Sequence, residues 1–104
     1  MTGTGGAPEP FVAAEEASDN LRIEFIKNEL AMCFTFSVLA SIKYEAGDHD
    51  LARQSLDHAE EAYAAAAPLV SRPEHSKYLT GAVIREFTRE LDRLRERLDE
   101  LHRL

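Results

Sequence analysis

Apolar residues recur along this chain at intervals of three and four, the periodicity of helices that bury one side. Between about Ser18 and Ala46 two such apolar stripes share one helix, so residues 30–42 are apolar around most of the circumference. A single helical neighbour covers only one side, so a third helix or a second subunit is also expected. The stripes are Leu21, Phe25, Met32, Phe36 and Leu39, and Ile23, Ile26, Leu30, Cys33 and Phe34.

Turn signals divide the rest of the chain into two further helices. Gly47-Asp48 is predicted to end the first helix, because glycine tolerates the left-handed position and aspartate caps the next helix start. The second helix is predicted over about residues 49–67, with Pro68 ending it because proline breaks the helical hydrogen-bond ladder. The third is predicted from residue 73 or 76 to the chain end.

The third helix carries a heptad seam, a row of apolar residues spaced 3, 4, 3, 4 and 3. Charged residues occupy most of its other positions, and four arginines recur there at every fourth residue, which is typical of a solvated face. The seam has two interpretations: it packs inside the chain as a bundle core, or its distal half forms a dimer. About 28 residues of helix would match the first helix in length. The seam consists of Ile84, Phe87, Leu91, Leu94, Leu98 and Leu101.

The expected architecture is all-α: an antiparallel bundle of three main helices, the second shorter than the other two. A chain of 104 residues has room for one domain. Residues 1–17 are predicted to be a disordered N-terminal tail, since the first ten residues hold three glycines and two prolines. Residues 18–104 are predicted to be the single helical domain.

Charge and cysteine content limit the binding partners and the cellular compartment that we expect. The net charge is −7, and residues 1–71 alone carry four basic and twelve acidic side chains. Such a surface repels phosphate backbones, so nucleic-acid binding is not expected. Cys33 is the one cysteine, so no internal disulfide can form. The start lacks a signal-peptide pattern and the longest apolar run is short for a bilayer, so a cytoplasmic protein without membrane contact is expected.

No residue pattern indicates enzyme chemistry, a metal or a cofactor. A carboxylate-bridged metal site in a bundle needs Glu-x-x-His pairs, and the four histidines form none. There is no glycine-rich phosphate loop and no nucleophile motif. We therefore expect a protein that is not an enzyme and that binds no cofactor.

Residues 36–68 resemble a tetratricopeptide repeat, a helix–turn–helix unit of 34 residues with large and small residues at fixed offsets. Small residues at those offsets let the two helices cross closely. Lys43 and Ala64 depart from the tyrosine and proline of the family pattern, and only one copy is present. The matching packing positions are Phe36, Leu39, Ala40, Gly47, Ala52, Leu56 and Ala59.

The resemblance implies a protein-interaction role and one helical face where relatives bind peptides. Relatives that clamp a peptide carboxylate use basic residues and asparagine there, whereas this chain has Ser37 and Ser41. A carboxylate clamp is therefore not expected. A lone unit also cannot stack into an array, so other helices must cover it.

These patterns favour a protein–protein interaction module of the adaptor or scaffold type, with self-association as a homodimer. The alternative is a binder of small apolar ligands, with a cavity lined by Phe25, Met32, Phe36, Phe87 and Tyr78. A pocket of several hundred Å³ would distinguish the two. The predicted interaction surface is Phe25, Met32, Leu91, Leu94, Leu98 and Leu101.

Overall fold

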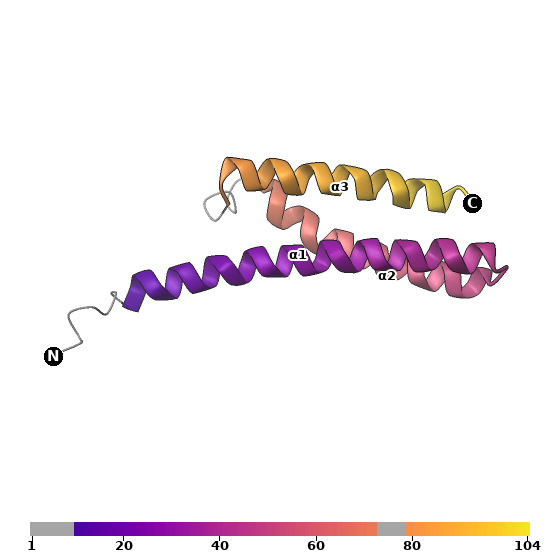
Figure 1. Ribbon diagram of the computed structural model, residues 1–104, viewed down its shortest axis with the longest axis horizontal. Coiled ribbons are helices and arrows are strands. Elements are labelled where there is room, and N and C mark those ends of the chain that lie inside the picture. Colours follow the sequence, from indigo (N-terminus) through magenta and orange to yellow (C-terminus); the bar gives the residue numbers. More distant parts are fainter. Residues whose placement is uncertain (1–9, 73–78) are drawn as a thin grey trace.

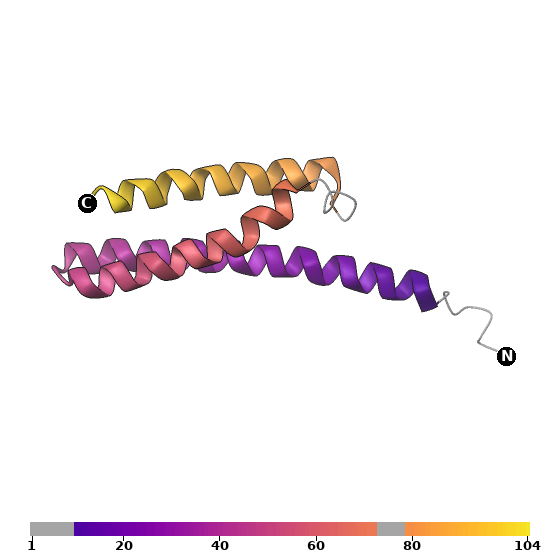
Figure 2. The same ribbon diagram turned by 180° about the vertical axis from the view of Figure 1, so that it is seen from behind.

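The computed structural model describes residues 10–72 and 79–104, and within these ranges the chain is helical with short turns. Three helices follow one another without a strand in the described ranges: α1 (Pro10–Glu45), α2 (His49–Ser71) and α3 (Gly81–His102). The all-α fold class with three main helices is thus confirmed. Figures 1 and 2 show α1 and α2 as a hairpin, with α3 running alongside it antiparallel to α2.

Helix α1 begins at Pro10, earlier than the start expected near Ser18. Residues 10–17, assigned to the disordered tail, are therefore helical in the structure. Proline is favoured at the first helical position because its missing N–H has no partner there and its φ suits the helix. The following Ala-Ala-Glu-Glu-Ala run consists of strong helix formers. Pro10 thus starts a helix that the sequence interpretation placed after the tail.

The turn between α1 and α2 forms as predicted. Gly47 has a φ of +81°, in the left-handed region that glycine adopts without strain. The Asp48 N–H donates to the Lys43 carbonyl at 2.9 Å, which closes the end of α1. The Asp48 side chain then accepts from the Leu51 N–H at 3.3 Å and caps α2.

Helix α2 continues through Pro68 to Ser71, so the predicted stop at Ala67 was wrong. Proline removes one hydrogen bond, but the ladder resumes because the Arg72 N–H donates to the Pro68 carbonyl at 3.1 Å. Figure 2 shows α2 changing direction near this end, where it approaches α3. Val70, beyond the proline, is 4% exposed. Packing of this last turn offsets the lost hydrogen bond.

Helix α3 begins at Gly81, where the Val83 N–H donates to the Thr80 hydroxyl at 3.2 Å. Of the segment expected to start this helix, residues 73–78 lie outside the described residues. With 36, 23 and 22 residues, α1, α2 and α3 do not have the expected lengths. The first and third helices are unequal, and the second is not the shortest. A capping threonine after the proline-bounded segment accounts for the late start of α3.

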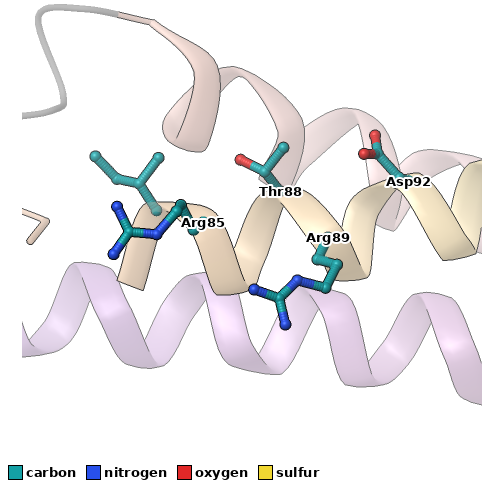
Figure 3. Close-up of a pocket in the computed structure, with 5 residues that line it drawn as sticks. Arg85, Thr88, Arg89 and Asp92 are labelled. Carbon is teal, nitrogen blue, oxygen red and sulfur yellow. The ribbon is translucent and has the colours of Figure 1, made fainter. Parts of the chain in front are cut away.

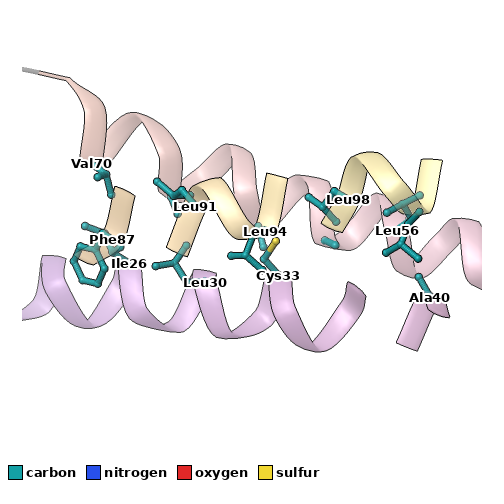
Figure 4. Close-up of a cluster of buried hydrophobic side chains, with 14 of the residues drawn as sticks. Ile26, Leu30, Cys33, Ala40, Leu56, Val70, Phe87, Leu91, Leu94 and Leu98 are labelled. Carbon is teal, nitrogen blue, oxygen red and sulfur yellow. The ribbon is translucent and has the colours of Figure 1, made fainter. Parts of the chain in front are cut away.

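The core lies where α3 faces the hairpin (Figure 4). Helix α1 contributes a buried face with heptad spacing, and α2 contributes small residues that allow close approach. Helix α3 contributes five of the six heptad-seam residues, each at most 8% exposed, while Ile84 is half-buried. The buried faces are Ile26, Leu30, Cys33, Ser37 and Ala40 of α1, and Ala52, Leu56, Ala59, Ala62, Ala66 and Val70 of α2.

The assembled helices form an elongated body of 67 × 26 × 17 Å. Its radius of gyration is 18.4 Å, whereas a compact chain of this length has about 13 Å. Figure 1 shows the N-terminal part of α1 extending past the ends of the other two helices. Much helix surface therefore remains uncovered within one chain.

Candidate functional site

The most conspicuous surface feature is a row of large apolar side chains on the outer side of α1, called here the α1 stripe. It consists of Leu21, Phe25, Met32 and Leu39, which are 70%, 44%, 46% and 38% exposed. On a helix with 3.6 residues per turn these positions fall within about 40° of one another. They point well away from the buried face that contains Leu30. The α1 stripe is thus an apolar face without a partner in the described chain.

The predicted interaction surface divides into two unlike parts. Phe25 and Met32 are exposed on the α1 stripe. The four predicted leucines of α3 instead lie in the core, where their exposed fractions are 6% or less. Their assignment to an outer surface was wrong, because α3 turns its only apolar face toward the hairpin. The core interpretation of the heptad seam accounts for Leu91, Leu94, Leu98 and Leu101.

The predicted ligand cavity is not found among the described residues. Phe87 is in the core at 6% exposure, whereas Phe25 is on the surface. Met32 and Phe36 line a surface hollow of about 320 Å³ beside α2, which neither of the other two phenylalanines reaches. Tyr78 lies outside the described residues. The proposed lining residues point in different directions because they belong to different faces of their helices.

This hollow between α1 and α2 adjoins the α1 stripe and is named the α1–α2 hollow. Its apolar part consists of Met32, Phe36, Ala62 and Ala65, and the Phe36 ring lies 5.0 Å from the His58 ring between centroids. Two carboxylates, Glu29 and Glu61, also line it. Neither forms an ion pair with an arginine or lysine among the described residues, although Glu61 lies 4.0 Å from His58. An apolar floor with acidic edges suits an apolar side chain next to a basic one.

The tetratricopeptide-like packing positions have mixed surroundings. Ala40, Ala52 and Ala59 are fully buried and Leu56 is 5% exposed. Phe36 is half-buried, whereas Leu39 belongs to the exposed α1 stripe. The small residues lie at the contact between α1 and α2, which is where close helix approach requires them.

Ser37 occupies a core position that the sequence interpretation assigned to a peptide-binding face. Its hydroxyl accepts from Arg97 Nε at 2.7 Å and donates to the Phe34 carbonyl at 2.6 Å. The Arg97 guanidinium also lies 5.6 Å from the centre of the Phe34 ring. Helix α3 therefore covers this face of α1 around Ser37. The arginines that recur at every fourth residue of α3 were all predicted to be solvated, and their spacing gave no sign that Arg97 bonds Ser37.

A second polar cluster fastens α2 to α3 around Glu60. Arg95 donates two hydrogen bonds to this carboxylate at 2.9 and 2.5 Å, and also bonds Asp99 at 3.0 Å. His102 Nε2 lies 2.7 Å from Glu60 Oε2. The hydrogen bond from Arg95 lowers the pKa of Glu60 below its ordinary value, and the bond to His102 lowers it further. Arg95 also lies over the Tyr63 ring, 5.0 Å from its centre.

The exposed side of α3 carries a hollow of about 300 Å³ lined by Ile84, Arg85, Thr88, Arg89 and Asp92 (Figure 3). Arg85 and Arg89 form no ion pair with the described residues. The lining residues come from successive turns of one helix, so the hollow is a gap between side chains of α3. Nothing in it converges on a common point.

Features that could support redox or metal chemistry are weak. Cys33 is fully buried, and desolvation raises the pKa of its thiol to about 11, so it stays protonated and unreactive. Among the described residues, no group of three or more His, Cys, Asp or Glu side chains is placed to hold a metal.

Helix α1 also passes a length and composition test for a membrane span over Asp19–Glu45. Only 28% of the tested window is buried within the chain. The core helix of a soluble protein is mostly buried when it passes the same test. The result reflects the exposed α1 stripe together with the apolar buried face, and it is weak evidence for a membrane.

Comparisons with known proteins leave the surface to be interpreted from its own geometry. No protein-family model, no curated protein and no solved structure matches the chain.

Proposed function

We propose that this protein is an interaction module of the adaptor or scaffold type that self-associates as a homodimer through the α1 stripe. One observation carries the proposal: four large apolar side chains with heptad-compatible spacing line one exposed side of α1. Large apolar side chains exposed on one side of a helix favour a binding site for another molecule there, and the exposed Asn28 and Thr35 lie between them along the helix. A second copy would remove this area from water.

The total surface supports the same proposal. The chain exposes 7010 Å², whereas a compact monomer of 11.6 kDa is expected to expose about 5,800 Å². The elongated three-helix body, in which α1 is covered on one side, contributes to this difference. Dimerisation through α1 would bring the exposed area per chain closer to that of a compact protein.

The tetratricopeptide resemblance stays part of the proposal. Ala40, Ala52 and Ala59 support it, because all three are buried where α1 and α2 cross, and Gly47 supports it through its left-handed turn. Ser37 limits it, since Arg97 of α3 occupies the position at which a bound peptide would lie. The proposed interaction therefore uses the outer side of α1 and not the usual concave groove.

The proposal is tested by Met32→Glu and sedimentation velocity over a range of protein concentrations. The unmodified chain is expected to dimerise at micromolar concentration. Placing a carboxylate in the middle of the α1 stripe should weaken dimerisation at least about tenfold, because a charge would be desolvated in the interface. Lys27→Glu is the matched control: it introduces the same side chain into α1 about 135° from the stripe and should leave dimerisation nearly unchanged.

Two outcomes would contradict the proposal. A strict monomer at every concentration would mean that the α1 stripe does not join two copies. Flotation of the protein with neutral phosphatidylcholine vesicles, lost in Met32→Glu, would instead assign the stripe to a lipid surface. Circular dichroism of each variant should show unchanged helix content, which separates lost contacts from lost folding.

A further inference from the structure

We propose that two copies pair through α1 in antiparallel orientation, with Leu21 of each copy against Met32 of the other and Arg22 opposite Glu29. This inference rests on the proposed function, because it names the occupant of the α1 stripe and its orientation. Helix α1 carries both the protruding Leu21 and one wall of the α1–α2 hollow. A two-fold axis near residues 26 and 27 would satisfy both contacts twice.

The shape and charge of the α1–α2 hollow carry the first part of the argument. Leu21 is the most exposed large apolar residue of α1, and the basic residue Arg22 follows it directly. The hollow offers the apolar side chains Met32 and Phe36 next to the carboxylates Glu29 and Glu61. A leucine followed by an arginine is therefore complementary to it in both respects.

The charges beside the stripe decide the orientation. In a parallel in-register pair, a residue beside the α1 stripe of one copy faces the residue five positions later on the other copy. Glu24 of one copy would therefore face Glu29 of the other. That arrangement places like charges together on both sides of the dimer. In the antiparallel pair, Glu29 instead faces Arg22, and Glu24 faces the neutral Ala31. Arg22 already bonds Asp19 at 3.4 Å, and a guanidinium has several N–H donors, so it can bond more than one carboxylate.

The length of α1 is compatible with the same register. Helix α1 runs from Pro10 to Glu45, so its midpoint lies between residues 27 and 28. An axis near residues 26 and 27 overlaps almost the entire helix with its partner, over about 51 Å. This overlap includes the N-terminal part that extends past α2 and α3 (Figure 1).

The test is a charge-reversal pair measured alone and mixed. Arg22→Glu places glutamates opposite each other in its antiparallel homodimer, and Glu29→Arg places arginines opposite each other. Each variant alone should dimerise about tenfold more weakly than the unmodified chain. An equimolar mixture should recover the original affinity as a heterodimer, because both pairs are then of opposite sign. Sedimentation velocity with one variant fluorescently labelled measures both quantities.

Glu24→Arg is the matched control, since it makes the same substitution one helical turn away. In the antiparallel dimer, residue 24 faces no charge, so affinity should change less than twofold. In a parallel dimer, Glu24→Arg and Glu29→Arg would each strengthen association by removing a repulsive pair, and that result would overturn the inference. A second result would also overturn the inference: Met32→Glu abolishes association, but no charge reversal changes it. The proposed function would still stand in that case.

Pulsed electron spin measurements give a second, direct test of orientation. A spin label on Glu45→Cys should lie roughly 55 Å from its counterpart in the antiparallel dimer, because the labels sit at opposite ends of the paired helices. A parallel dimer would bring them within about 20 Å. The native Cys33 is fully buried and its thiol pKa is raised to about 11, so it should escape labelling. A short distance would overturn the antiparallel arrangement.

Discussion

The heptad seam of α3 and the α1 stripe have similar spacing in the sequence and opposite surroundings in the structure. Leu91, Leu94 and Leu98 are at most 6% exposed, whereas Leu21, Phe25 and Met32 are at least 44% exposed. Helix α3 has one apolar face, and the hairpin covers it. Helix α1 has two apolar faces, and α2 and α3 together cover only one of them. Periodicity therefore identifies an apolar helix face without saying what packs against it.

The largest difference between the two regions should appear on truncating the seam. Leu98 is fully buried between α3 and the hairpin. Leu98→Ala should lower the free energy of unfolding by about 3 kcal/mol, because it removes buried area and leaves a cavity. Urea denaturation followed by circular dichroism measures the change. A loss below about 1 kcal/mol would indicate that α3 is not held by its seam.

Ser37→Ala tests the polar contact within the buried face of α1. The substitution leaves Arg97 Nε without the acceptor that it reaches at 2.7 Å. We expect a loss of about 1 to 2 kcal/mol in the free energy of unfolding, since a partly buried donor becomes unpaired. The double variant Ser37→Ala with Arg97→Met should recover part of it, as both polar groups are then removed. Thermal denaturation of the three variants provides the comparison.

Acidification should weaken the attachment of α2 to α3. Hydrogen bonding by Arg95 lowers the pKa of Glu60 in the folded chain relative to the ordinary value of 4.5. The contribution of this carboxylate to stability is therefore full above pH 4.5 and is lost as pH falls through the lowered folded pKa.

Glu60→Gln isolates this part of the acid response. It should lower the free energy of unfolding by about 1 kcal/mol at neutral pH, because the ion pair is partly solvent-screened. The variant should also lose less stability than the unmodified chain between neutral and acid pH. Denaturant titrations at several pH values measure this, and Asp57→Asn, at an exposed carboxylate of the same helix, is the control. Equal acid sensitivity in both variants would contradict the role of Glu60.

The smallest effect on folding is expected at the α1 stripe itself. Leu21 is 70% exposed, so Leu21→Ala should change the free energy of unfolding of the monomer by less than about 0.5 kcal/mol. The same substitution should weaken the proposed dimer. The measurement is chemical denaturation below and above the dimer dissociation constant, because only the dimer contribution depends on protein concentration. A large loss at low concentration would show that Leu21 belongs to the monomer core.

Local chemistry accounts for the parts of the fold that the sequence predicted correctly. The apolar periodicity of α3 and the Gly47-Asp48 turn required no knowledge of distant residues. Boundaries were predicted less well where packing competes with propensity. Pro68 lies within α2 because Val70 beyond it is buried. The partners of Ser37 and Glu60 lie 60 and 35 residues away along the chain, so no local pattern could identify them.

The helices, the position of their apolar faces and the turn between α1 and α2 all follow from the order of residues along the chain. They depend on backbone preferences and on the spacing of side chains on a helix. Which apolar face becomes core and which stays in water depends instead on how the three helices pack. Helices α2 and α3 both pack on the face that contains Ile26, Leu30 and Cys33. The α1 stripe is left exposed because one chain has no further helix with which to cover it.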